Sequence, residues 1–228
     1  MEISVERKRL DKENIIVMVG GWKAPKIIFN RLKREVPRSW GFIHYHYTGD
    51  ILNSDPYLTK KYCLKLMKQI VKELRVLSKI GKKKFYFYEQ SLGGIFCVYA
   101  LNKIDVKKAY FVVPGDNLAE CFWKGKETRE LKKEMEKKGI TLTTLKQIWK
   151  PISPDSNFNG KAKKVKYFFK ISVRDEIIPY KNGKKLYDLL KKKGYTIELS
   201  EGVLNHKETC LYECLFPERA IRFLTQDL

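Results

Sequence analysis

Short apolar runs alternate along the chain with longer stretches in which apolar residues recur every three or four positions. The first run, NIIVMVG at residues 14–20, is apolar almost throughout and ends in glycine. Further runs rich in β-branched and aromatic residues predict strands at residues 40–47, 84–88, 107–113, 165–172 and 195–200. Several are apolar at successive positions, which is typical of parallel strands covered on both faces.

Amphipathic segments separate these runs, and the longest covers residues 56–80. The same three-to-four spacing predicts further helices at residues 24–35, 92–103, 179–193 and 207–223. Strands that alternate with helices predict an α/β fold: a mostly parallel sheet of about six strands flanked by helices. A seventh strand follows if residues 3–7 pair at an edge.

Residues 114–164 interrupt the alternation. This stretch carries a charged helical segment at residues 126–138, a stop at Gly139 and a second short helical pattern at residues 143–150. A connection this long inside a compact domain is usually functional. We therefore expect a small helical lid or cap inserted into a single domain that spans residues 1–228, with two ordinary packing helices as the alternative.

The segment FYFYEQSLGG, residues 85–94, carries the strongest chemical signal. An apolar strand runs into Ser91, and Gly93 follows at the start of a predicted helix. A sharp strand–helix turn needs a small residue there, and the helix start points free backbone N–H groups at the serine. The segment resembles the nucleophile elbow, G-x-S-x-G, of the α/β-hydrolase superfamily. It departs from that pattern at Glu89, which stands in place of the first glycine.

The superfamily carries its catalytic residues in the order serine, acid, histidine. Asp175 follows the fifth predicted strand in ISVRDEIIPY, and His206 follows the sixth in ELSEGVLNHKE. The resemblance therefore implies that Ser91 is the nucleophile, His206 the base and Asp175 the acid. Two other acids stay open as alternatives to Asp175: Asp116, which follows the fourth strand, and the less favoured Asp155 in the insertion.

The resemblance also implies an oxyanion hole. Its first donor is the backbone N–H of Leu92, and its second lies in the Gly20-Gly21-Trp22 loop, where we favour Gly21 over Trp22. In the position before the catalytic histidine, where the family usually has a small residue, this chain has Asn205. The candidate substrate-binding residues are Trp22, Glu89, Trp123 and Trp149.

The sequence predicts neither a metal nor another cofactor. His44 and His46 alternate along a strand, but no third ligand accompanies them, so a structural role is favoured. No phosphate-binding loop or dinucleotide fingerprint is present. An odd number of cysteines without a signal peptide indicates reduced thiols that pack in the interior; they are Cys63, Cys97, Cys121, Cys210 and Cys214.

The net charge is +21, from 47 Lys and Arg against 26 Asp and Glu. Because 37 of the basic residues are Lys and 10 are Arg, we expect a solvated lysine-rich surface and no nucleic-acid partner. An anionic or carrier-bound acyl substrate fits the charge. No apolar run approaches the roughly 18 residues of a membrane span, and the charged first residues are unlike a secretory signal. A cytoplasmic location is therefore expected.

These features predict a serine hydrolase that cleaves a carboxylic ester or thioester through an acyl-enzyme. Peptidase, lipase and acyltransferase activities remain open, because the α/β-hydrolase fold supports many chemistries. The alternative from another class is a catalytically silent binding protein with this fold and a basic surface. Glu89 at the elbow is the residue that supports it.

Overall fold

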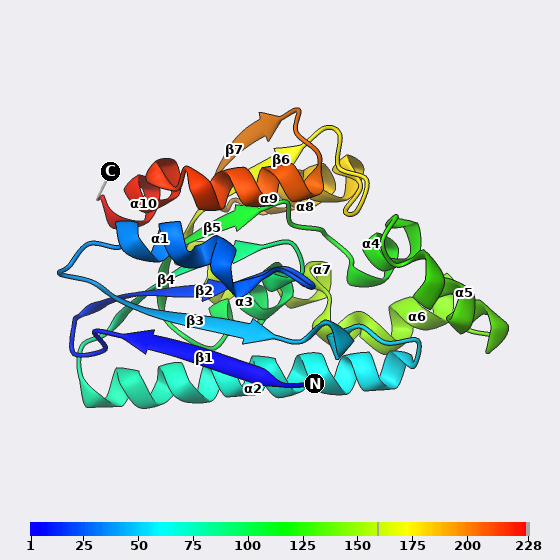
Figure 1. The fold of residues 1–228 in the computed structure, drawn as a ribbon, viewed down its shortest axis with the longest axis horizontal. Coiled ribbons are helices and arrows are strands. Elements are labelled where there is room, and N and C mark those ends of the chain that lie inside the picture. The colour runs from blue at the N-terminus through cyan, green and yellow to red at the C-terminus, as the bar shows by residue number, and fades with distance from the viewer. Residues whose placement is uncertain (159, 227–228) are drawn as a thin grey trace.

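The computed structural model describes residues 1–158 and 160–226. Seven strands form one sheet in the order β1-β3-β2-β4-β5-β6-β7 (Figure 1). β1 runs antiparallel to β3, and the other neighbours are parallel. The predicted α/β class is thus confirmed, and the edge strand is present. The strands are β1 (Ile3–Lys8), β2 (Asn14–Val19), β3 (Gly41–Tyr47), β4 (Lys84–Gln90), β5 (Val106–Val112), β6 (Lys166–Ser172) and β7 (Thr196–Gly202).

Both faces of the sheet are buried. Along β2, Ile15, Val17 and Val19 join one core cluster, whereas Ile16 and Met18 join the other. This is why the central strands are apolar at successive positions. The first face packs against α2 (Pro56–Ile80), α3 (Gly93–Leu101) and α8 (Tyr180–Lys192), and the second against α1 (Asn30–Glu35), α9 (His206–Leu215) and α10 (Glu218–Thr225) (Figure 1).

Helix ends follow local chemistry. α2 has the predicted bounds because the Asp55 side chain accepts the N–H groups of Tyr57 and Leu58, and Pro56 opens the helix. The helix predicted at residues 207–223 is instead two, since Pro217 lacks an N–H and breaks the ladder between α9 and α10. The one predicted at residues 24–35 is a 3₁₀ turn, η1 (Lys26–Phe29), followed by α1. Over the described part of the chain, no helix combines the length and apolar character of a membrane span.

The segment between β5 and β6 lies at the carboxyl ends of the parallel strands, on the right in Figure 1. The predicted helices at residues 126–138 and 143–150 correspond to α5 (Arg129–Lys137) and α6 (Leu142–Trp149). Two more helices were not predicted: α4 (Leu118–Lys124) and α7 (Pro154–Asn157). They are only seven and four residues long, too short to show a helical period. Residue 159 of the predicted lid lies outside the described residues.

Candidate active site

Three of the predicted side chains lie in one hydrogen-bonded chain. The Oγ atom of Ser91 is 3.0 Å from Nε2 of His206, and Nδ1 of His206 is 2.7 Å from Oδ2 of Asp175. Ser91 follows β4, Asp175 follows β6 and His206 follows β7, all at the carboxyl ends of parallel strands. The topology of the sheet therefore brings together residues that are up to 115 positions apart in the sequence.

The backbone at Ser91 is in the left-handed region, with φ of 53°. This conformation is uncommon outside glycine and is held here because the Ser91 N–H donates to the carbonyl of Val112 at 2.8 Å. Gly93 makes the turn possible: a Cβ there would lie 2.4 Å from the carbonyl oxygen of Val19. The sharp turn lifts the serine hydroxyl above the end of β4, where it meets His206.

The Asp175 carboxylate has a separate role for each oxygen. Oδ1 accepts the backbone N–H groups of Ile177 and Ile178 at 2.9 and 2.8 Å, whereas Oδ2 faces His206. Its side chain is 3% exposed. With a proton on Nδ1, the imidazole donates to Asp175 and leaves Nε2 free to accept from Ser91. The carboxylate thus fixes both the orientation and the tautomer of the ring.

His206 is the first residue of α9, and the helix cap fixes its place. The Asn205 side chain accepts the N–H of Glu208, while the Glu208 side chain accepts the N–H of Asn205. Such a capping box defines where a helix begins. The unusual residue before the histidine is therefore accounted for: Asn205 anchors the helix start that presents His206 to Ser91.

The two alternative acids do not contact His206. Asp116 is buried, and its carboxylate accepts from Nδ2 of Asn182 at 2.7 Å and pairs with Nζ of Lys185 at 2.8 Å. Asp155 accepts from Nδ2 of Asn117 at 2.9 Å. Asp116 thus connects the insertion to α8, whereas Asp155 joins two parts of the insertion to each other. Of the three candidates, Asp175 is the acid that the fold brings to the histidine.

No family model matches this sequence, and no curated protein matches it. Solved structures do match. The acylaminoacyl peptidase of Pyrococcus horikoshii superposes with a TM-score of 0.68 at 16% identity, over 100% of this chain and 40% of that one. The esterase Pf2001 of Pyrococcus furiosus superposes with a TM-score of 0.65 at 17% identity, over 97% of this chain and 84% of the esterase. A chain of the glycosylation associate protein (Gap123) complex of Streptococcus agalactiae superposes with a TM-score of 0.67 at 14% identity, over 99% of this chain and 45% of that one.

The chain has the α/β-hydrolase fold. It spans 40% of the length of the peptidase. Because identity to each of these proteins is below 20%, the likeness concerns the α/β-hydrolase fold and not a shared substrate. The fold alone therefore does not determine the activity, which depends on the chemistry of the site.

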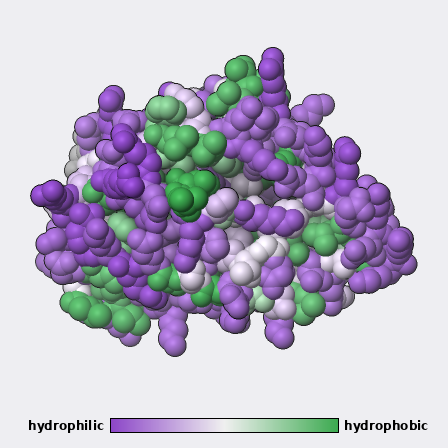
Figure 2. All heavy atoms as spheres, in the orientation of Figure 1, coloured by the Kyte–Doolittle hydropathy of each residue, from purple (hydrophilic) through white to green (hydrophobic). Residues whose placement is uncertain are grey.

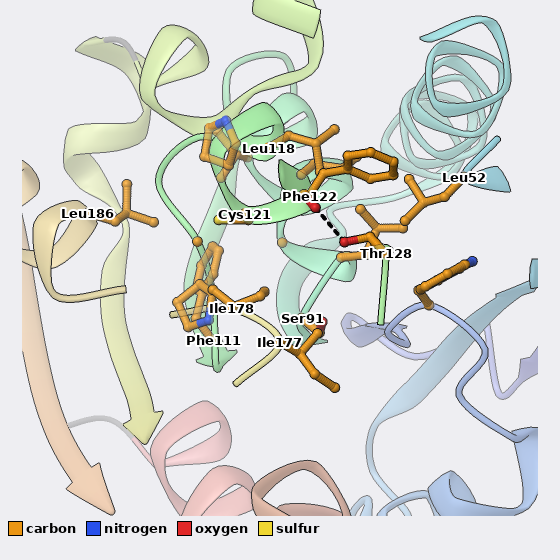
Figure 3. A pocket seen from close by; sticks show the side chains of 18 residues that line it. Leu52, Ser91, Phe111, Leu118, Cys121, Phe122, Thr128, Ile177, Ile178 and Leu186 are labelled. Carbon is orange, nitrogen blue, oxygen red and sulfur yellow. Dashed lines mark hydrogen bonds between the residues drawn. The ribbon is translucent and has the colours of Figure 1, made fainter. Parts of the chain in front are cut away.

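An apolar pocket opens beside Ser91 in this α/β-hydrolase fold (Figure 3). It encloses about 620 Å³, including its open mouth. Among the described residues, those that line it carry no charge. Most of the residues in its wall were not predicted from the sequence, although Ile177 and Ile178 lie two and three residues after Asp175. The lining residues are Trp22, Leu52, Ser91, Leu92, Gly94, Ile95, Val98, Phe111, Pro114, Gly115, Leu118, Cys121, Phe122, Thr128, Pro154, Ile177, Ile178 and Leu186.

Of the predicted tryptophans, only Trp22 lines this pocket. Trp149 is completely buried, and its indole N–H donates to the carbonyl of Pro56 at 2.8 Å. Trp123 packs against the core beneath the ammonium group of Lys132. The prediction that Trp123 and Trp149 line the pocket is wrong here, because both are used to pack the insertion.

The loop after β2 lies directly against the serine. A Cβ on Gly21 would be 3.0 Å from Cβ and 3.6 Å from Oγ of Ser91. The predicted donors of an oxyanion hole, the backbone N–H groups of Gly21 and Leu92, thus belong to two segments that adjoin Ser91. Trp22 follows in the same loop, and its indole N–H donates to the carbonyl of Gly49.

The insertion also contacts the loop that carries the acid. The N–H of Lys126 donates to the carbonyl of Glu176 at 3.0 Å, and a Cβ on Gly125 would lie 2.6 Å from the carbonyl oxygen of Ile177. Across the site, Lys207, next to His206, forms an ion pair with Glu127. The segment between α4 and α5 is therefore fastened to both sides of the hydrogen-bonded chain.

Glu89 does not reach the pocket. It is fully buried under α3, and neither carboxylate oxygen has a hydrogen-bond partner among the described residues. A Cβ on Gly94 would lie 3.1–3.3 Å from this carboxyl group. The predicted substrate contact is therefore wrong. Burial raises the pKa of Glu89 well above its ordinary value, so the side chain is held neutral.

Replacing Glu89 by Gln should change the pH dependence of stability. Above a pH of about 4.5 the Glu89 side chain is ionised in the unfolded state, whereas in the folded state it stays protonated. The folded state then binds the extra proton, so stability falls as pH rises from there to the raised pKa of the folded state. Glu89→Gln should match the wild type near pH 4.5 and be more stable by about 1–3 kcal/mol at alkaline pH. Urea unfolding at a series of pH values gives the free energy of unfolding of both proteins. Parallel curves of this free energy against pH would refute the prediction.

The remaining histidines and cysteines have packing roles. His44 is buried and stacks on Phe29 with ring centroids 4.4 Å apart, and burial lowers its pKa to about 3, so it is neutral. His46 lies with Nε2 3.2 Å from the carbonyl of Ala24. Nowhere in residues 1–158 and 160–226 do three His, Cys, Asp or Glu gather as metal ligands. All five cysteines are free thiols.

Proposed function

We propose that the chain is a serine hydrolase that cleaves a carboxylic ester or thioester through an acyl-enzyme. The observation that carries the proposal is the chain of hydrogen bonds from Ser91 through His206 to Asp175, at 3.0 and 2.7 Å. A serine in this setting can lose its proton as it attacks, because the imidazolium that forms is stabilised by the carboxylate.

The reaction proceeds in two halves. Ser91 Oγ attacks the acyl carbonyl while its proton moves to Nε2 of His206, and the oxyanion that develops accepts hydrogen bonds from the N–H groups of Leu92 and of the Gly21–Trp22 loop. The tetrahedral intermediate collapses, and His206 returns the proton to the leaving alcohol or thiol. Water then attacks the acyl-enzyme with His206 as base, which releases the acid and restores Ser91.

The acyl group is apolar. The pocket next to Ser91 presents aliphatic and aromatic side chains, and the hydroxyl of Thr128 within it already donates to the carbonyl of Phe122 (Figure 3). A charged acyl group would lose its hydration there and find no partner. The segment 114–164 acts as the lid over this group. Any anionic part of the substrate belongs to the leaving group, on the solvent side.

Labelling with an alkyl fluorophosphonate tests the proposal. The probe phosphonylates an activated serine and displaces fluoride, and its alkyl chain suits the apolar pocket. We expect wild-type protein to be labelled and Ser91→Ala to be unlabelled with an unchanged thermal transition, since the change removes one hydroxyl. Glu89→Gln, which alters a buried neutral group, serves as a labelled control. Folded wild type that stays unlabelled would overturn the proposal in favour of the silent binding protein.

A further inference from the structure

Six cationic side chains form a row along the outer face of α2. We call it the α2 cation row: Lys61, Lys65, Lys68, Lys72, Arg75 and Lys79. All six are exposed, and each is three or four positions from the next. At 3.6 residues per turn they fall within an arc of about 80° and extend for about 27 Å. Figure 2 shows hydrophilic side chains projecting from the lower edge of the molecule, where Figure 1 places α2, beside a hydrophobic patch at the left end of that edge.

The row has no partners in the part of the chain that the structure describes. None of its members forms a hydrogen bond or an ion pair there. The sole acid of α2, Glu73, lies off the row and pairs with Arg7 at 2.6 Å. Like charges at this spacing repel and destabilise a helix. A row of this kind weakens α2 unless an anion neutralises it.

On three other helices of this lysine-rich chain, a lysine has an acidic partner on the same helix. At the same four-residue spacing Lys124 pairs with Glu120, Lys132 with Glu136 and Lys184 with Asp188. On α2, by contrast, six cations in one row have no acid at this spacing.

The carboxyl-terminal half of the row lines an open groove between α2 and the end of α3. Lys68, Lys72, Arg75 and Lys79 form one wall, and Lys103 stands on the other with its Nζ 4.3 Å above the ring of Tyr99. The acid in the lining, Asp105, is already paired with Lys107. The groove contains about 1470 Å³, open to solvent, and lies at the amino ends of the strands, opposite Ser91.

We propose that this groove binds the phosphodiester backbone of a single-stranded nucleic acid without reading its sequence. Basic grooves with an aromatic ring are suited to single strands, and lysine supplies point charges for phosphate but little base readout. A duplex strand winds away from a straight row, whereas a flexible single strand can follow it. A flat lipid surface does not enter a groove. The proposal replaces the expectation that nucleic acid is absent and does not depend on the hydrolase activity.

Fluorescence anisotropy with labelled single-stranded RNA and DNA of about 20 nucleotides tests the proposal between about 50 and 200 mM KCl. Four or five neutralised phosphates predict a slope of log affinity against log salt of about −3, at 0.7 per phosphate. The triple variant Lys68→Glu, Lys72→Glu, Arg75→Glu should bind more than about tenfold less tightly. The magnitude of its slope should fall by about 2, because three cations are removed. The variant should keep its thermal transition, since the new acids pair with the remaining cations.

The matched control changes the net charge equally on α8 and at the residue that follows it: Lys181→Glu, Lys192→Glu, Lys193→Glu, all exposed. It should keep most of the affinity and the full slope. An equal loss in both triple variants would show that only net charge matters and would overturn the groove. Absence of binding to either oligonucleotide would also overturn it, as would preferential binding to phosphatidylglycerol vesicles, which would assign the exposed Val76 and Ile80 beside the row to a lipid surface.

Discussion

Replacing Asp175 by Asn should lower kcat for an activated ester by about 10⁴-fold and leave the fold intact. The amide keeps an oxygen that can accept from Ile177 and Ile178, as Oδ1 does now. Its NH₂ group, however, would face Nδ1 of His206 in place of a carboxylate oxygen. The imidazole then has to take the other tautomer, with a proton on Nε2, and can no longer accept from Ser91. Steady-state hydrolysis of a p-nitrophenyl ester beside thermal unfolding measures both effects.

Asp116→Asn is the matched control. Asp116 has no contact with His206 and instead holds Asn182 and Lys185 at the base of the insertion. We expect kcat to stay within about threefold, since the chemistry does not use this group, with a lower unfolding midpoint because Lys185 loses its ion pair. A large loss of kcat in Asp116→Asn together with a small one in Asp175→Asn would transfer the role of acid to Asp116.

Gly93→Ala should destabilise the fold by about 3 kcal/mol and abolish labelling of Ser91. The new methyl group would lie 2.4 Å from the carbonyl oxygen of Val19 and 3.1 Å from that of Gly20. Both are backbone atoms, of β2 and of the loop after it, so they cannot rotate away as a side chain could. Either α3 moves off the sheet or β2 shifts, and each movement alters the turn at Ser91. Urea unfolding monitored by tryptophan fluorescence gives the change in free energy.

Gly94→Ala, one residue later, provides the comparison. The three atoms nearest to its Cβ would all belong to the carboxyl group of Glu89, at 3.1–3.3 Å. A shift of a few tenths of an ångström relieves that contact, and alanine favours a helix by about 1 kcal/mol over glycine. The net change should lie within about 1 kcal/mol of zero. Equal losses in the two variants would show that the approach of α3 to β2 is not what requires Gly93.

The order of strands and helices was readable from the sequence because the central strands are buried on both faces and the long helices on one. The site could be predicted because each of its three residues lies within four positions of the end of a strand, where the chain leaves little freedom of placement. Glu89 was misplaced, although a signal existed. In β4, Phe85 and Phe87 face the core beneath α2 and α3, and strand alternation puts Glu89 on the same side.

The pocket wall and the short helices of the insertion were not readable. Their positions depend on contacts between distant segments, such as the hydrogen bond from Trp149 to Pro56 and the capping of α4 by Asn117. Neither contact leaves a periodic pattern in the sequence. Residue type alone suggests that the tryptophans line the pocket. Two of the three, Trp123 and Trp149, instead pack the insertion, and no pattern in the sequence indicates this.

The bonds between the insertion and the loops of the acid and the histidine have a consequence for how such a protein can be altered. Lys126 is joined to Glu176, and Glu127 to Lys207. A change of substrate preference made by exchanging this segment for that of another hydrolase would also remove two supports of the catalytic geometry. The segment is therefore not an interchangeable module. Its sequence and those of the two loops are expected to change together, so a transplant succeeds only when all three are moved as a set.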